Sequence, residues 1–149
     1  VALGVDSAGR DGGGPFGSVV AVGGRIVGEG VNRVTGTPDP TAHAEIEAIR
    51  SAAATLGTNV LVGAVVYASC EPCPMCLAAC YWARVDGVVF AAARYAAAAV
   101  GFDDAFLHDE LAMAPADRRL RVRHVDGVDG VDGGAPFAAW VNNEARTPY

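Results

Sequence analysis

The stretch VLVGAVVYASCEPCPMCLAACYWA, residues 60–83, joins a long apolar run to all four cysteines of the chain. Its first part, Val60 to Tyr67, is almost continuously apolar and β-branched, which is typical of a strand covered on both faces. Its last part, Leu77 to Ala83, has the composition of a helix that follows directly. The sequence therefore predicts a strand-to-helix unit with cysteines at the junction.

The segments on both sides continue this alternation of strands and helices. Val19 to Val22 and Arg25 to Gly30 predict a hairpin, because Gly23-Gly24 between them suits a tight turn. Ala42 to Leu56 predicts a helix with Thr41 or Asp39 as its cap. The other expected elements are a strand at Val85 to Ala91, a short segment from Gly101 to Leu111, a possible last strand at Leu120 to Val125, a flexible connector at Gly127 to Gly134 and a terminal helix at Pro136 to Tyr149. This order predicts a layered α/β fold in one domain spanning residues 1–149.

Size and charge limit the classes of function. A chain of 149 residues fits one domain. Its formal net charge of −6 argues against tight binding to a nucleic-acid backbone, which needs a basic face. No apolar run approaches the roughly 20 residues of a membrane span, and no secretory signal is visible. The expected compartment is the cytoplasm.

Three side chains form a candidate metal site. Cys73 and Cys76 are three residues apart at a predicted helix start, so both sulfurs can reach one ion. His43 begins another predicted helix, and helix starts that follow neighbouring strands can meet at one sheet edge. An imidazole with two thiolates favours zinc, and three protein ligands leave one position for water. Cys70 or Cys80 could instead be a fourth ligand, which would make the site structural.

Glu45 lies two residues from His43 and could transfer protons without binding the metal. Zinc lowers the pKa of a bound water to about 7, which makes hydroxide available at neutral pH. A nearby carboxylate can accept the proton of this water and pass it to the substrate. The expected chemistry is attack of zinc-bound hydroxide on an amidine-type carbon and release of ammonia, with Glu45 as the proton shuttle.

The two metal motifs occur here in a known combination. His43-Ala44-Glu45 followed by Pro72-Cys73-Pro74-Met75-Cys76 matches the H-x-E and P-C-x-x-C signature of zinc deaminases. The chain resembles the cytidine-deaminase-like superfamily over nearly its whole length, and it looks closest to the small bacterial guanine deaminases. The segments that carry the resemblance are Pro15-Phe16-Gly17, Asn32-Arg33-Val34-Thr35, residues 39–45, residues 69–76, Tyr81-Trp82-Ala83-Arg84, Gly101-Phe102-Asp103-Asp104 and the terminal Tyr149.

This resemblance implies a three-layer α/β/α sandwich with a central mixed sheet of about five strands. It also implies one Zn²⁺ per chain and the conversion of guanine to xanthine and ammonia. A homodimer is implied as well, in which C-terminal segments from about residue 127 to 149 are exchanged and cover the partner's site. The connector at Gly127 to Gly134 is unusually rich in glycine and aspartate. This departure from the family pattern affects the expected reach of the exchanged segment.

The resemblance also assigns substrate contacts, residue by residue. The residues expected to bind or line the base are Asn32, Ala44 (through its backbone), Phe16, Trp82 and Tyr149. Asn32 would hydrogen-bond the base, although it could simply close a turn. Trp82 could equally belong to the core or to a dimer interface. Tyr149 has no support beyond the resemblance, because terminal residues are often frayed.

Two neighbouring aspartates compete for a second catalytic role. The resemblance implies that one carboxylate assists proton transfer, and Asp104 is the preferred candidate. Asp103 is expected to cap a helix instead, although Asp104 could also do so. His108 and His124 have no motif context and are expected to be surface residues.

Other functions remain open. A tRNA adenosine deaminase would share the zinc motifs but would need a basic surface near the site. Deaminases of cytosine, cytidine or triazine-type heterocycles would share the chemistry, because specificity depends on the placement of hydrogen-bonding groups. A non-catalytic, zinc-stabilised binding module is the alternative from a different class, and such a module has no use for Glu45.

Overall fold

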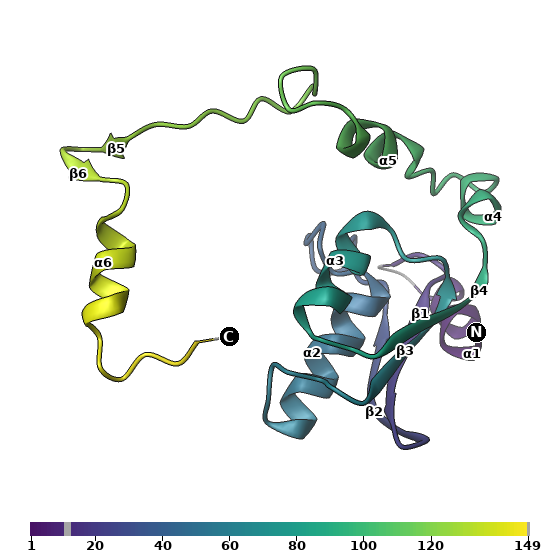
Figure 1. The fold of residues 1–149 in the computed structure, drawn as a ribbon. Helices are drawn as coiled ribbons and strands as arrows, with labels where there is room; N and C mark the ends of the chain where they lie inside the picture. Colours follow the sequence, from purple (N-terminus) through teal and green to yellow (C-terminus); the bar gives the residue numbers. More distant parts are fainter. Residues whose placement is uncertain (11–12, 149) are drawn as a thin grey trace. The chain divides into compact units, whose positions relative to one another are not determined.

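The computed structural model describes residues 1–10 and 13–148 of the 149-residue chain. The chain divides into two compact units, Val1–His108 and Asp109–Tyr149, drawn as one ribbon in Figure 1. The first unit contains a mixed sheet and the candidate site, and the second contains a short hairpin and a helix. The predicted substrate residue Tyr149 lies outside the described residues.

The first unit is built on a four-stranded sheet in the order β2-β1-β3-β4. Its strands are β1 (Gly17–Val22), β2 (Arg25–Val31), β3 (Ala64–Cys70) and β4 (Gly87–Ala92). β1 is antiparallel to both β2 and β3, whereas β3 and β4 are parallel. Strands β2, β3 and β4 therefore end at the same edge of the sheet. The predicted hairpin is present, with Gly23 and Gly24 at φ values of 56° and 80° in its turn.

Helix α2 (Ala44–Leu56) packs against β1 and β2 on one face of the sheet. Ala48 and Ala52 are fully buried on this helix, and a Cβ atom at Gly28 of β2 would collide with their backbone. Small residues on both elements therefore let the helix approach the strand closely. Helix α3 (Pro74–Trp82) contacts α2 on the same side of the sheet (Figure 1). The buried core comprises Val20, Ala48, Ala52, Leu61, Ala64, Val66, Cys80 and Ala83.

The opposite face of the sheet is only partly covered within the first unit. Helix α1 (Ala2–Ala8) packs against β1 and β2 and lies on the side away from α2 (Figure 1). Successive strand residues point to opposite faces, so Tyr67 points away from its buried neighbours Val66 and Ala68. Tyr67 pairs in register with Val89, and the two residues are 46% and 51% exposed. An apolar strip therefore remains open on this face.

The remaining elements are α4 (Arg94–Ala98), α5 (Ala105–Ala112), β5 (Gly127–Val128), β6 (Val131–Asp132) and α6 (Ala135–Asn142). The expected connector at Gly127 to Gly134 is not featureless, because it contains the β5–β6 hairpin. Asp129 and Gly130 form the turn of this hairpin, with φ values of 53° and 78°. The prediction of a possible last strand at Leu120 to Val125 was wrong, because that segment has no regular structure and pairs with no described strand.

The α/β fold class predicted from the sequence is confirmed, but the central sheet has four strands where about five were expected. The third strand also begins later than predicted, at Ala64. Of the residues before it, Leu61 fills the core at 1% exposure while its N–H donates to the Ala83 carbonyl over 2.7 Å, whereas Val60 and Val62 are 44% and 69% exposed. Within the described residues, no helix combines the length and hydropathy needed to cross a membrane.

Candidate active site

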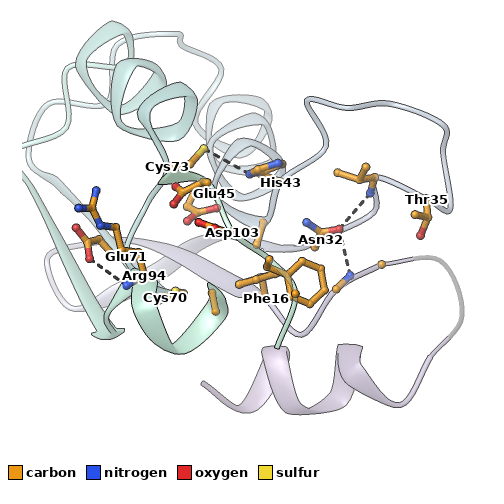
Figure 2. A pocket seen from close by; sticks show the side chains of 18 residues that line it. Phe16, Asn32, Thr35, His43, Glu45, Cys70, Glu71, Cys73, Arg94 and Asp103 are labelled. Atoms are coloured by element: carbon orange, nitrogen blue, oxygen red, sulfur yellow. Dashed lines mark hydrogen bonds between the residues drawn. The ribbon is translucent and has the colours of Figure 1, made fainter. Parts of the chain in front are cut away.

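Two helix N-termini meet beside a pocket at the carboxyl edge of the sheet (Figure 2). His43 is the N-cap of α2, in place of the predicted Thr41 or Asp39, and has φ −71° and ψ 156°. Cys73 is the N-cap of α3, with φ −65° and ψ 167°. An N-cap residue lies outside the helical turns, so both side chains are free to face each other across the gap. Asp39 instead accepts hydrogen bonds from Thr41 within the preceding loop.

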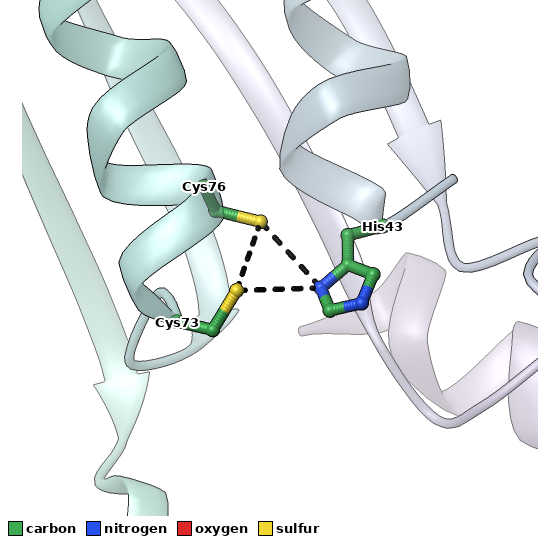
Figure 3. Close-up of side chains that lie close together, drawn as sticks. All are labelled: His43, Cys73 and Cys76. Carbon is green, nitrogen blue, oxygen red and sulfur yellow. Dashed lines mark hydrogen bonds between the residues drawn. The ribbon is translucent and has the colours of Figure 1, made fainter. Parts of the chain in front are cut away.

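His43, Cys73 and Cys76 form a compact triangle of donor atoms (Figure 3). The Sγ atoms of Cys73 and Cys76 lie 3.6 Å and 3.5 Å from His43 Nδ1, and 3.6 Å from each other. A tetrahedral zinc ion with bonds of about 2.3 Å to sulfur and about 2.0 Å to nitrogen separates sulfur from nitrogen by about 3.5 Å and two sulfurs by about 3.8 Å. The observed triangle therefore fits one zinc ion.

The charges within the triangle also suit a cation. The hydrogen bond between the two cysteine side chains lowers the pKa of Cys73 to about 4, and the same contact raises the pKa of Cys76. A hydrogen bond with Cys73 raises the pKa of His43. The cluster thus carries a thiolate beside two helix N-termini, which favour negative charge. A bound metal ion would hold both sulfurs as thiolates.

Cys70 and Cys80 do not join the triangle. In the part of the chain that the structure describes, His43, Cys73 and Cys76 are the one group of potential ligands within 4.8 Å of one another. Cys80 is 2% exposed in the apolar core, where burial raises the pKa of its thiol to about 11. Cys70 ends β3 and lines the pocket separately. The arrangement therefore favours an open site over a structural zinc site closed by a fourth cysteine.

Glu45 is the acid nearest to this triangle. It is the second residue of α2, only 8% exposed, and it lines the same pocket as His43. Its Oε2 accepts a hydrogen bond from the Cys76 thiol over 3.5 Å. Burial raises the pKa of the Glu45 carboxyl, which moves it towards the range where a carboxylate both takes and returns protons near neutral pH. Glu45 thus lies beside the three donors without being one of them.

The pocket has a volume of about 420 Å³, within the range of small-molecule sites. Residues that follow β2, β3 and β4 line it, as is usual for ligand sites of α/β sheets. Asn32, Ala44 and Phe16 line it as predicted. Trp82 is 64% exposed at the end of α3 and is not among the lining residues. The structure therefore does not bring Trp82 to the pocket, and its role in binding stays a prediction.

Asn32 has a defined orientation. Its Oδ1 accepts hydrogen bonds from the backbone N–H groups of Gly14 and Val34, each over 3.2 Å (Figure 2). Because the carbonyl oxygen is used by the backbone, the amide NH₂ group is the part left to face a ligand. The Ala44 N–H is also available as a donor, because the first N–H groups of a helix have no partner within the helix. The pocket therefore presents hydrogen-bond donors.

Phe102 also lines the pocket, a role that its place in the Gly101-Phe102-Asp103-Asp104 motif did not predict. Its ring packs edge-to-face against Phe16, with centroids 5.0 Å apart and an interplanar angle of 87°. A Cβ atom at Gly14 would lie 3.0 Å from the Phe16 ring and 3.1 Å from the Phe102 ring. The glycine therefore makes room for an aromatic pair that forms one wall of the pocket. Glu71 and Arg94 also line the pocket without having been predicted.

Asp103 and Asp104 both line the pocket but make different contacts. Asp103 Oδ1 accepts a hydrogen bond from the Ala105 N–H over 2.9 Å, so this side chain caps α5. The Asp104 carboxylate accepts no such bond from the backbone of the described residues, and its Oδ2 lies 3.4 Å from Nε2 of His108. The contacts thus favour Asp104 as the carboxylate available for chemistry.

Comparisons with known proteins agree with this geometry. Residues 2–92 match the family model described as the cytidine and deoxycytidylate deaminase zinc-binding region. The chain is 44% identical over 137 residues to a guanine deaminase of Bacillus subtilis (strain 168), covering 92% of this chain and 86% of that protein. A crystal structure of guanine deaminase from Bacillus subtilis superposes with a TM-score of 0.92 at 42% identity, covering 100% of this chain and 93% of the other. A tRNA-specific adenosine deaminase of Agrobacterium fabrum (strain C58 / ATCC 33970) is 42% identical over 78 residues, covering 52% of this chain and 51% of that protein.

Proposed function

Because the chain belongs to the cytidine and deoxycytidylate deaminase family, we propose that it hydrolyses the amino group of a free nucleobase, converting guanine to xanthine and ammonia. Family membership confirms the resemblance inferred from the motifs. It also confirms that the chain is an aminohydrolase and that its cofactor is Zn²⁺, in agreement with the His43, Cys73 and Cys76 cluster.

The ligand set that we assign to zinc is His43, Cys73 and Cys76. The spacing of the three donor atoms supports this assignment, and it is the observation that carries the proposal. When bound there, zinc supplies the Lewis acidity that makes water a competent nucleophile near neutral pH. A site with three protein ligands retains a position for that water.

Glu45 is the group that we assign to proton transfer. Its Oε2 accepts the proton that the attacking water loses and delivers it to a ring nitrogen of the base. The amino group then leaves as ammonia, after taking up a further proton through the same carboxylate. The burial of Glu45 supports this role, because a shielded carboxyl holds a proton more readily than an exposed one.

The hydrogen-bond donors of the pocket support a purine substrate, because a purine base carries hydrogen-bond acceptors. Asn32 and Ala44 both line the cavity, and the Asn32 amide NH₂ and the Ala44 N–H are donors left over from backbone bonding, whereas the guanine ring offers a carbonyl oxygen and ring nitrogens as acceptors. The aromatic wall formed by Phe16 and Phe102 gives a flat base an apolar surface. Asp104, at the opening of α5, is assigned to assist the proton transfer.

An ammonia-release screen tests the substrate. The zinc-loaded protein is incubated with guanine, adenine, cytosine, cytidine, guanosine, ammeline and tRNA, and zinc content is measured in the same preparation. We expect guanine to have the highest kcat/KM, with little dependence on salt because a neutral base releases no counterions. Turnover of tRNA without turnover of guanine would reject the substrate and leave the chemistry intact. A zinc-loaded protein that is inactive on every compound would favour the binding-module alternative.

We further propose that two chains associate and exchange their C-terminal segments, from about residue 127 to Tyr149. In α6, Phe137 and Val141 are 74% and 63% exposed. A helix of eight residues is marginal without tertiary packing, and the strip around Tyr67 is also uncovered. Light scattering on the full chain is expected to give the mass of a dimer, and a monomer would contradict the proposal. Removal of Tyr149 alone is expected to lower turnover without unfolding the protein.

All four cysteines are free thiols, and zinc-binding thiolates need a reducing environment. This requirement supports the cytoplasm as the compartment of the enzyme.

A further inference from the structure

We propose that His108 is a positioning residue that holds the Asp104 carboxylate towards the pocket, so that Asp104 can assist proton transfer to the substrate. The inference rests on the proposed function and extends it to a histidine outside every deaminase motif. His108 was expected to be a surface residue with no role. Its surroundings differ from that expectation.

The two side chains are paired by the geometry of one helix. Asp104 directly precedes α5, and its carbonyl accepts the Leu107 N–H over 2.9 Å, so the first turn of the helix begins from this residue. Residues four apart lie one above the other on a helix, which brings His108 over Asp104. The distance from His108 Nε2 to Asp104 Oδ2 is 3.4 Å.

The ring nitrogen that faces Asp104 is shielded from solvent. His108 Nε2 is a buried atom, and among the described residues no hydrogen-bond acceptor is well aligned with it. The separation of 3.4 Å is within reach of an ion pair but long for a hydrogen bond. Contacts of this kind often shorten only when substrate is bound. A buried nitrogen without a hydrogen-bond partner costs free energy, so a hydrogen bond to the adjacent carboxylate would be favourable.

The neighbouring carboxylate shows why Asp104 needs such a partner. Asp103 is held in place by the Ala105 N–H at the start of α5. Within residues 1–10 and 13–148, the Asp104 side chain has no backbone donor of this kind; it is 24% exposed and lies at the wall of the pocket. Without His108 its carboxylate could rotate away from the site. Pairing with one oxygen fixes the carboxylate and leaves the other oxygen for the substrate.

A purely structural pair would also stabilise α5, so the test must separate the two roles. We would measure kcat and KM for guanine in zinc-loaded wild type, His108→Leu, His108→Gln, Asp104→Asn and the double variant His108→Leu/Asp104→Asn. Glutamine keeps an N–H donor at similar reach, whereas leucine has none. The expected result is a fall in kcat of about 10-fold for His108→Leu with little change in KM, because misplaced catalytic groups lose rate. Most of this activity should return in His108→Gln.

The double variant is the decisive measurement. If His108 acts through Asp104, adding His108→Leu to Asp104→Asn should lower kcat no further. An equal loss in both backgrounds, or wild-type kcat in His108→Leu, would overturn the proposal while Asp104→Asn still reports on the proposed catalytic role. A wild-type enzyme that is inactive on every base would instead overturn the proposed function.

A readout that is independent of turnover completes the test. The ¹⁵N resonance of His108 Nε2 should shift in Asp104→Asn, because the nitrogen loses its charged partner. His124 is a matched control, since it lies 3.8 Å from Asp126 but is 86% exposed in its side chain. The His124 resonance should be unchanged. An unshifted His108 resonance would show that no pair exists and would overturn the inference.

Discussion

Replacement of Glu45 by glutamine should abolish most turnover while zinc stays bound. Glutamine keeps the size of the side chain but cannot take up and return a proton. General acid–base groups contribute about 10²- to 10⁴-fold to rate. Glu45 is 8% exposed and lies against the metal cluster, whereas Asp104, the second carboxylate proposed to assist proton transfer, precedes α5 and is 24% exposed in its side chain. We therefore expect a loss well within this range, about 10³-fold in kcat or about 4 kcal/mol in the barrier.

The assay compares kcat at saturating guanine, zinc content by elemental analysis and Tm for wild type and Glu45→Gln. The matched control is Glu47→Gln, the same substitution two residues further along α2, where the carboxylate pairs with Arg50 at the surface over 2.9 Å. The control should keep kcat within about 2-fold, because an exposed pair contributes little. Turnover within 10-fold of wild type in fully zinc-loaded Glu45→Gln would refute the proton shuttle. Loss of zinc from that variant would show instead that Glu45 is a ligand.

Three further experiments, each based on substitutions, test the metal site, the substrate pocket and the packing of the fold. Cys73→Ala should lose both zinc and activity. Cys80→Ala should keep one zinc and lower the free energy of unfolding by only about 1 kcal/mol, as measured by metal analysis and denaturation. Loss of zinc from Cys80→Ala would mean that a fourth sulfur closes the site. Asn32→Asp should lower kcat/KM for guanine by at least about 100-fold, because a carboxylate has no N–H donor to offer. An unchanged kcat/KM would remove Asn32 from the binding site. Gly28→Ala should destabilise the fold by about 2 kcal/mol in urea unfolding, since its Cβ collides with the α2 backbone. Gly87→Ala is the control and should be close to neutral, because in the described part of the chain a Cβ at Gly87 meets nothing within 4 Å beyond its chain neighbours.

The metal motifs could be predicted from the sequence because local spacing determines them. Cys76 is three positions after Cys73, so a helix that begins directly after Cys73 brings the two sulfurs together. His43 could be added because the alternation of strands and helices places two helix starts at one sheet edge. These are consequences of chain geometry that need no side-chain detail.

Other features depend on contacts that the sequence does not display. Leu61 belongs to an apolar run that predicts a strand, yet it fills the core from the segment before β3. Its N–H bonds to the Ala83 carbonyl and not to a neighbouring strand. The division of roles between Asp103 and Asp104 depends on which carboxylate meets the Ala105 N–H. The β5–β6 hairpin was missed although Asp129-Gly130 is a recognised turn signal, because its short strands lack an apolar pattern.

The coordination of zinc in the purified protein is the most direct test of the proposed site. X-ray absorption at the zinc edge counts sulfur and nitrogen or oxygen neighbours without reference to activity. With His43, Cys73 and Cys76 as ligands, the spectrum should contain two sulfurs at about 2.3 Å and two lighter atoms at about 2.0 Å. Three or four sulfurs around the metal would show that Cys70 or Cys80 completes the shell, and an open catalytic zinc in this chain would be contradicted.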